Sequence, residues 1–349
     1  MNTAALTEKL RACHDLTDAE LLRFLNEPQD ESALFAAADA ERRKWYGDAV
    51  YLRGLIEFTN YCKNNCFYCG IRAGNPHTER YRLTDAQILE CCAQGYALGY
   101  RTFVLQGGED PYFTDDKVCE LVSAIAERYP DCRITLSIGE KSRESYQRYY
   151  NAGARRYLLR HETASPAHYR KLHPENMSSE NRKRCLRDLQ AIGYQTGSGF
   201  MIGSPYQTAD DLLADIRFLQ ELQPAMIGVG PYITHPETPF ADQPSGELHF
   251  SLKIIALLRL MFPKALIPAT TAFGALHPQG RELALKAGGN VMMPNLSPKD
   301  VRKLYDLYEN KLCIGEEAAQ SYEHLAACIH AAGYRIVSDA GDSLVTHHS

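Results

Sequence analysis

Three closely spaced cysteines are the residues of this sequence whose type and spacing could support chemistry. Cys62, Cys66 and Cys69 stand in the stretch NYCKNNCFYCGIR, separated by three residues and then by two. A structural zinc site is closed by four protein ligands, and a cluster of four irons also has four corners to be ligated. Three thiolates would leave one coordination position open. An open position is where a substrate or co-substrate binds, so the spacing predicts a reactive metal centre.

Two other interpretations of these cysteines stay open. The chain has 11 cysteines, so the spacing could arise by chance, or a distant residue could complete a zinc site. The odd number argues against a complete disulfide framework, and free thiols are typical of a reducing compartment. Seven of the other cysteines are expected to be small buried side chains: Cys13, Cys91, Cys92, Cys119, Cys132, Cys185 and Cys328.

The elements that must position the cysteines alternate between strands and helices. The first fifty residues are predicted to be helical, and eight apolar, strand-like segments follow at residues 49–58, 101–106, 133–138, 156–160, 194–203, 225–230, 266–270 and 290–294. Helical patterns separate them at 85–98, 116–128, 142–151, 179–192, 209–220, 251–261 and 280–286. Eight strand–helix units predict an α/β fold, a TIM-type (β/α)8 barrel with N-terminal helices and a C-terminal helical extension. We expect one domain over 1–349, with helices in 1–47, the barrel in 48–296 and the extension in 297–349.

The predicted strand ends differ in character. Their carboxyl ends run into segments such as EFTNYC, LQGGEDPY, LRHET and PATTAF, which are rich in glycine, carboxylate, arginine, histidine and hydroxyl groups. Active sites of such barrels lie at that end. The pattern therefore predicts an enzyme, independently of the cysteines.

The cysteine loop resembles that of the radical S-adenosylmethionine (SAM) enzymes, with Tyr68 at the aromatic position before the third cysteine. The resemblance implies that Cys62, Cys66 and Cys69 hold a 4Fe–4S cluster whose open iron binds SAM. One electron from the cluster would then release a 5′-deoxyadenosyl radical. A glycine-containing turn after the second strand would offer backbone groups to the SAM amino group.

Longer sequence motifs resemble those of the HydE family of FeFe-hydrogenase maturases within that group. The resemblance extends from about Leu52 to Cys313, and its motifs are LQGGEDPY, YLLRHETASPAHYRKL, IPATTAFGALHPQGRE and MMPNLSP. The resemblance implies SAM contacts from Tyr68, Gly107, Gly108, Glu109, Ser137, Arg160, Glu162 and Arg182. It also implies a substrate cavity lined by Arg53, Gln106, His161, Met226, Thr270, Thr271, Tyr305 and Tyr308. Plain structural roles stay open, such as an Arg160–Glu162 ion pair, strand packing by the threonines, a helical stripe formed by the tyrosines and an interior His161.

The family resemblance also implies a function and partners. The radical would act on a sulfur-containing small substrate, a cysteine-bound iron carbonyl–cyanide complex, during hydrogenase H-cluster maturation. Other hydrogenase maturases and an electron donor such as ferredoxin or flavodoxin would be partners. No catalytic side chain is predicted. Of the three positions that hold a second cluster in some relatives, only Cys313 is a cysteine; Ser321 and His324 occupy the others, so we expect one cluster.

Alternatives from other classes remain. A methylornithine synthase-like mutase would need a buried anchor for an amino acid. A biotin synthase-like enzyme would need cysteines on interior strand positions, and a zinc scaffold would need no polar strand ends.

Composition gives the remaining expectations. The formal net charge of −5 and the absence of a long basic run argue against a nucleic-acid partner. No apolar stretch reaches the roughly 20 residues of a membrane span, and the first residues do not form a signal peptide. We therefore expect a cytoplasmic protein, without a membrane partner, that acts as a monomer.

Overall fold

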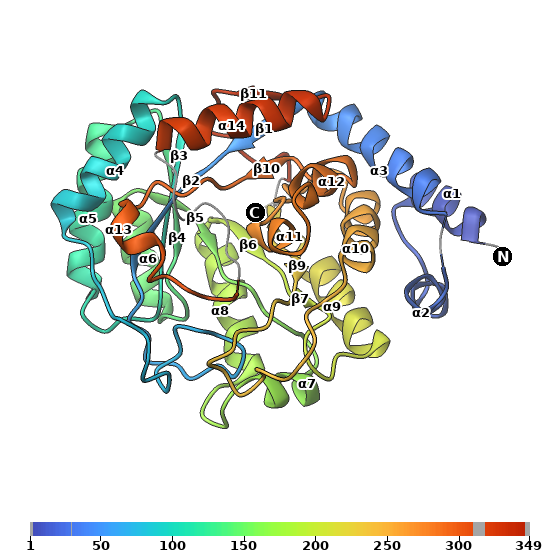
Figure 1. Cartoon of the computed structure of the whole chain (residues 1–349), viewed down its shortest axis with the longest axis horizontal. Helices are drawn as coiled ribbons and strands as arrows, with labels where there is room; N and C mark the ends of the chain where they lie inside the picture. The colour runs from blue at the N-terminus through green and yellow to red at the C-terminus, as the bar shows by residue number, and fades with distance from the viewer. Residues whose placement is uncertain (1–2, 29, 310–317, 346–349) are drawn as a thin grey trace.

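The structure is a computed structural model that describes residues 3–28, 30–309 and 318–345. Three helices come first, α1 (Thr3–Cys13), α2 (Asp18–Asn26) and α3 (Glu31–Tyr46). A capping box of Thr17 and Glu20 starts α2, because each side chain bonds the other residue's backbone N–H. The helices lie outside the barrel, where α3 packs along α10 (Leu248–Met261) (Figure 1). Cys13 is exposed at the end of α1, so our expectation of a buried thiol is wrong there.

A parallel sheet in the order β2-β3-β4-β5-β6-β8 forms most of the barrel wall. Its strands are β2 (Gly54–Thr59), β3 (Thr102–Gly107), β4 (Arg133–Ser137), β5 (Ala154–Leu158), β6 (Gln195–Ser198) and β8 (Met226–Ile227). Short strands β7 (Met201–Ile202) and β9 (Gly230–Pro231) pair beyond the ends of β6 and β8. These strands are mostly buried along their whole length, as expected for strands covered on both faces.

Isolated bridges close the ring. The first predicted strand is divided at Arg53, so that β1 (Ala49–Leu52) pairs with β10 (Val291–Met292) while β2 pairs with β3. The segment after α10 supplies the seventh position through bridges from Leu266 to Met226 and from Pro268 to Val291. It forms no longer ladder, and Pro268 lacks the N–H that a ladder needs. The prediction of a TIM-type barrel is confirmed.

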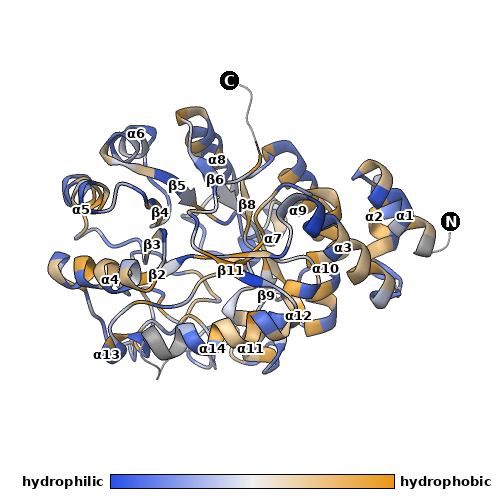
Figure 2. Ribbon diagram, turned by 90° about the horizontal axis from the view of Figure 1, so that it is seen from above, coloured by the Kyte–Doolittle hydropathy of each residue, from blue (hydrophilic) through white to orange (hydrophobic). Residues whose placement is uncertain are grey.

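Helices cover the outside of the barrel. They are α4 (Asp85–Ala97), α5 (Asp115–Arg128), α6 (Arg143–Ala152), α7 (Pro166–Leu172), α8 (Ser179–Ile192), α9 (Ala209–Leu222), α10, α11 (Thr271–Leu276) and α12 (Gly280–Lys286). Seen from above, they carry hydrophobic and hydrophilic residues side by side, as amphipathic helices should (Figure 2). The prediction that Thr270 and Thr271 belong to a strand is wrong, because Thr270 is the N-cap of α11.

The C-terminal part contains α13 (Lys299–Arg302), α14 (Ala318–Ala331) and β11 (Arg335–Val337). Tyr305 and Tyr308 follow α13 in irregular backbone, so the predicted helical stripe is wrong. The strand β11 was not predicted, and it pairs with β1 beside the barrel.

The segment after β11 crosses the amino ends of the strands; we call residues 338–345 the strap. Its Asp342 accepts hydrogen bonds from Arg156 (2.7 Å) and Gln195 (2.7 Å). The carbonyl of Ala340 accepts from Arg156 (2.7 Å) and from the Thr102 hydroxyl (2.8 Å). The strap therefore closes the barrel end that lies opposite the carboxyl ends of the strands.

Candidate functional site

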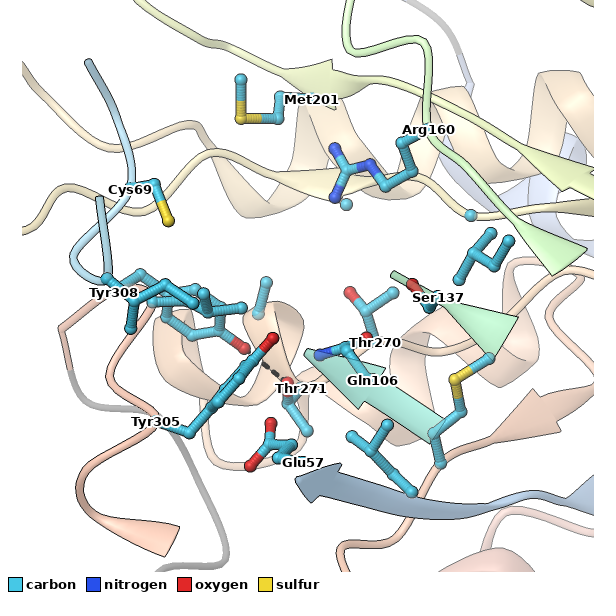
Figure 3. A pocket seen from close by; sticks show the side chains of 18 of the residues that line it. Glu57, Cys69, Gln106, Ser137, Arg160, Met201, Thr270, Thr271, Tyr305 and Tyr308 are labelled. Carbon is cyan, nitrogen blue, oxygen red and sulfur yellow. Dashed lines mark hydrogen bonds between the residues drawn. The ribbon is translucent and has the colours of Figure 1, made fainter. Parts of the chain in front are cut away.

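A cavity of about 380 Å³ lies at the carboxyl ends of the barrel strands. Most of the predicted site residues line it: Cys62, Cys66, Tyr68, Cys69, Gln106, Gly107, Gly108, Glu109, Ser137, Arg160, Glu162, Arg182, Thr270, Thr271, Tyr305 and Tyr308. Figure 3 shows residues from distant parts of the chain pointing into this space. The fold therefore brings the cysteines and the predicted SAM and substrate residues into one cavity.

The cysteine loop connects β2 to α4 and is held by polar side chains. Arg80 donates hydrogen bonds to the carbonyls of Ile71 (2.8 Å) and Arg72 (2.7 Å), and Asn60 donates to the carbonyl of Leu304 (2.8 Å). Burial raises the pKa of the Cys69 thiol to about 12, and it also raises the pKa values of the Cys62 and Cys66 thiols. Binding a metal centre here would require these thiols to release protons.

The three thiols are not gathered around one point. Within the described ranges, no three His, Cys, Asp or Glu side chains are placed to hold a single metal ion. A single zinc ion needs its ligands to converge at about 2.0–2.3 Å. An iron–sulfur cluster takes one thiolate at each of several irons, so its ligands need no common centre.

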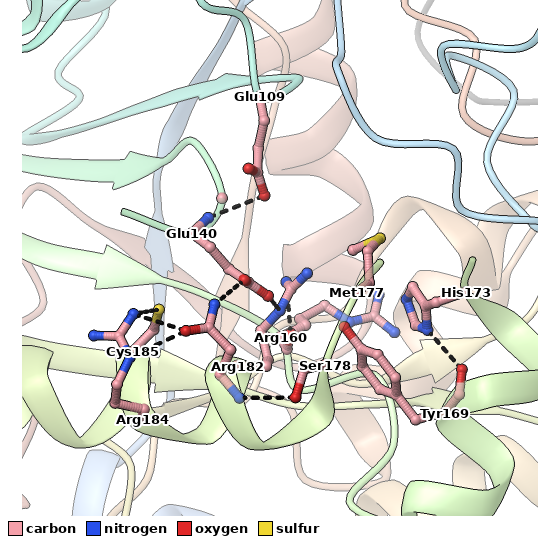
Figure 4. A network of polar contacts seen from close by, with 12 residues as sticks. Glu109, Glu140, Arg160, Tyr169, His173, Met177, Ser178, Arg182, Arg184 and Cys185 are labelled. Atoms are coloured by element: carbon pink, nitrogen blue, oxygen red, sulfur yellow. Dashed lines mark hydrogen bonds and ion pairs between the residues drawn. The ribbon is translucent and has the colours of Figure 1, made fainter. Parts of the chain in front are cut away.

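Two arginines, Arg160 and Arg182, also line the cavity (Figure 4). Arg182, at the start of α8, donates to Glu140 (2.6 Å) and to the carbonyl of Arg160 (3.2 Å). Burial opposes the charge of Arg182, but the Glu140 carboxylate together with further neighbouring groups outweighs it, and the pKa of Arg182 is raised well above its usual range. Arg160 Nη2 and Glu162 Oε2 form an ion pair at 3.0 Å, so the structural pair that the sequence left open is present, while Arg160 Nε has no hydrogen-bond partner among the described residues. The buried Nε of Arg160 is available to a charged ligand in the cavity.

Glycines let the backbone approach this space. A Cβ on Gly108 would lie 2.2 Å from the carbonyl oxygen of Tyr61. Gly139 has a φ of +78°, and a Cβ there would lie 2.1 Å from Cγ of Glu109. Glu109 in turn accepts the backbone N–H of Glu140 (3.0 Å). The turn after β3 therefore depends on residues without side chains.

The Tyr68 side chain forms part of the wall beside the cysteines. Its hydroxyl lies 3.2 Å from Nε2 of His173, a ring that is buried at the end of α7. Burial and the nearby charge of Arg182 lower the pKa of His173 to about 3, so this imidazole is neutral at ordinary pH.

Hydroxyl groups line the deeper part of the cavity. The hydroxyls of Thr271 and Tyr308 share a short hydrogen bond, and the amide of Gln106 lies nearby (Figure 3). The sequence analysis missed Glu57, which is fully buried, lines the cavity and accepts a hydrogen bond from Asn295 (2.6 Å). The sequence did contain a signal for this residue, because a carboxylate inside the apolar stretch GLIEFT is unusual unless it has a specific role.

Three predicted cavity residues do not line this cavity. Arg53 and Met226 lie together near the strap end of the barrel, where Arg53 Nη1 is 2.9 Å from the Met226 sulfur. His161 points away between β6 and α9, 3.0 Å from Ser198 Oγ and 3.3 Å from Asp215. Burial lowers the pKa of His161 to about 3. Alternation along the chain turns His161 outward while its neighbours face the cavity.

A parallel barrel with three thiols and two arginines at the carboxyl ends of its strands defines a class of enzymes. The chain belongs to the radical SAM superfamily: residues 56–219 match the family described as "Radical SAM superfamily". It is 47% identical over 293 residues to the "[FeFe] hydrogenase maturase subunit HydE" of Thermotoga maritima, covering 84% of this chain and 83% of that protein.

Other relatives are more distant. The 3-methylornithine synthase of Methanosarcina barkeri is 31% identical over 298 residues, with 84% of this chain and 83% of the relative covered. Among solved structures, methylornithine synthase (PylB) superposes with a TM-score of 0.84 at 28% identity, over 95% of this chain and 97% of that one. The maturase HydG matches with a TM-score of 0.82 at 20% identity, over 96% and 75%, which supports the fold alone.

Two further observations concern other predictions. No helix in the described part of the chain is long and apolar enough to cross a membrane. Cys313 lies outside the described residues, so the expectation of a single cluster stays a prediction.

Proposed function

We propose that this chain acts in maturation of the FeFe-hydrogenase H-cluster, as a radical SAM enzyme that modifies a sulfur-containing small substrate. The observation that carries the proposal is the joint lining of one cavity by Cys62, Cys66 and Cys69 and by the arginines Arg160 and Arg182. The 47% identity to a HydE protein supports the choice within the superfamily.

The residues of the cavity fit the two groups that this function requires. Cys62, Cys66 and Cys69 would hold a 4Fe–4S cluster, and Arg160, Glu162, Arg182, Ser137 and the Gly107–Glu109 turn would hold SAM. The unpartnered Nε of Arg160 supports this assignment. When bound, the cluster would supply the electron that breaks a carbon–sulfur bond of SAM.

The side chains of this protein would bind and orient rather than react. A guanidinium presents a planar pair of donors that suits a carboxylate, and Glu140 keeps Arg182 charged and fixed for that task. Walls such as Leu55, Leu159 and Met292 would exclude water from a reactive species. No residue is assigned a proton transfer.

The hydroxyl and amide groups of Gln106, Thr270, Thr271, Tyr305 and Tyr308 would bind the substrate. A cysteine-bound iron carbonyl–cyanide complex has the anionic ligands that such donors hydrogen-bond. Other hydrogenase maturases would supply and receive the small molecules, and a ferredoxin or flavodoxin would donate the electron. The proposal includes a single-domain monomer that works in the cytoplasm.

The test incubates anaerobically reconstituted protein with SAM, reductant and either the iron–cysteine complex or lysine. We expect an adenosylated product from the iron complex and 5′-deoxyadenosine from SAM. Cys62→Ser should abolish both products. Cys91→Ser is the matched control, because that thiol is buried in α4 away from the cavity. Turnover of lysine without turnover of the complex would refute the maturase assignment.

A methylornithine synthase-like mutase is the second candidate. The buried carboxylate of Glu57 could bind the ammonium group of an amino acid, and the lysine arm of the same assay tests this. Biotin synthase-like chemistry is disfavoured, since among the described residues no further cysteine lines the cavity.

A further inference from the structure

The end of α7 and its connection to α8 contact three consecutive residues of the cysteine loop. This loop has no regular secondary structure, so its shape depends on such contacts. The contacts are Phe67 N to Leu172 O (2.9 Å), Tyr68 Oη to His173 Nε2 (3.2 Å) and Cys66 Sγ to Met177 Sδ (3.9 Å).

Chemistry fixes the direction of the hydrogen bond between Tyr68 and His173. Nδ1 of His173 lies 3.1 Å from the carbonyl oxygen of Tyr169. A carbonyl oxygen only accepts, so Nδ1 of the neutral ring carries the proton. Nε2 is then an acceptor, and the hydroxyl of Tyr68 donates to it.

The imidazole of His173 is also immobilised by packing. It is 2% exposed, and it stacks on the Tyr169 ring with centroids 3.9 Å apart and planes at 18° (Figure 4). The Tyr68 ring meets it edge-on, at 5.4 Å and 89°. An acceptor held on a fixed helix end is able to fix the rotamer of the tyrosine that contacts it.

We propose that His173 is a positioning residue for SAM binding, whose Nε2 accepts the Tyr68 hydroxyl and so fixes the Tyr68 ring in the wall of the cavity. This inference rests on the proposed SAM site. Arg182 follows on the same segment, in α8, and lines the same cavity. One stretch of chain, residues 172–182, therefore connects the cysteine loop to the arginine that would bind the SAM carboxylate.

The test measures the Kd for SAM of reconstituted protein by equilibrium dialysis, without turnover. Loss of one neutral hydrogen bond corresponds to a rise of about 3- to 10-fold in Kd. We expect that rise for Tyr68→Phe and for His173→Phe, which keeps the stacking on Tyr169. The double variant should bind no more weakly than either single variant, because both remove the same bond. His173→Gln, which restores an acceptor, should recover part of the affinity.

His168→Phe is the matched control. His168 is 1% exposed in the same helix and lies 3.0 Å from the carbonyl of Pro205, away from the cysteine loop. We expect it to lower stability and leave the Kd unchanged. Iron content and circular dichroism verify folding in every variant.

The outcomes separate the inference from the proposed function. If the unaltered protein binds SAM and the Kd of Tyr68→Phe stays within twofold of it, the role of His173 is refuted. The Kd of Tyr68→Phe is sufficient to refute this role even if the His173→Phe variant does not fold. Additive losses in the double variant also refute the role. If the unaltered, cluster-loaded protein binds no SAM, the proposed function itself fails.

Discussion

Replacing Asp342 by asparagine tests whether the strap neutralises a buried charge at the closed end of the barrel. Arg156 is 2% exposed in its side chain and pairs with Asp342 at 2.7 Å, while the Asp342 side chain is 42% exposed. Breaking a buried pair costs about 3–5 kcal/mol, and an exposed pair contributes about 0–1 kcal/mol. Because one partner is buried and the other is half exposed, we expect Asp342→Asn to cost about 2 kcal/mol of unfolding free energy.

The effect should depend on pH in a defined direction. Burial raises the pKa of Asp342, but the hydrogen bond from Gln195 and the charge of Arg156 outweigh it and lower the pKa to about 2. The unfolded state binds the proton more tightly, near a pKa of about 3.9. The stabilisation is therefore present above about pH 4 and is lost as pH falls toward 2. The difference between the two proteins should be constant from pH 8 to 5 and shrink below pH 4.

Urea unfolding followed by circular dichroism measures this difference. Asp131→Asn is the matched control, because Asp131 is 48% exposed and pairs at 2.9 Å with Arg101, which is 25% exposed. We expect the control to cost less than about 1 kcal/mol. Equal losses in the two variants would refute the reasoning, because Asp342 pairs with a buried arginine and Asp131 with a partly exposed one.

Three further predictions concern the site and the core. Gly139→Ala should weaken SAM binding at least tenfold by displacing Glu109. Gly99→Ala, with a similar φ of +91° but a Cβ that would make only an ordinary 3.4 Å contact with Ser338 Oγ, should not; equal Kd values would contradict this. Burial lowers the pKa of Lys253 to about 8. Since the unfolded lysine binds its proton up to about pH 10.4, unfolding free energy should rise between pH 8 and 10, and Lys253→Met should lack that rise. Tyr308→Phe should lower kcat/KM for the iron complex while leaving the Kd for SAM unchanged; a change in SAM affinity would place Tyr308 elsewhere in the site.

The barrel was predictable because its strands are apolar along their length and its helices have clear starts. Thr84 and Gln87, for example, form a capping box at the start of α4. The helix α11 has only six residues, which is too few to show a helical pattern. The threonines at its start were therefore assigned to a strand. The strand β11 has three residues and was missed for the same reason.

The site was predictable where spacing alone determines placement, as for the cysteines. The position of a side chain along the barrel axis was not predictable. A sequence shows whether a side chain faces the barrel interior, but not how far it lies from the carboxyl ends of the strands. Arg53 therefore lies near the closed end rather than in the cavity. The roles of Glu140 and His173 depend on contacts with residues far away in the chain, and no local pattern marks them.

The strap also constrains how the protein is made. Synthesis runs from the amino end, so the strands that carry Thr102, Arg156 and Gln195 leave the ribosome well before Ala340 and Asp342, which bind them. Until then, a nascent barrel holds a desolvated guanidinium without its counter-ion. We expect the growing chain to stay loosely closed and dependent on chaperones until that late segment emerges and docks.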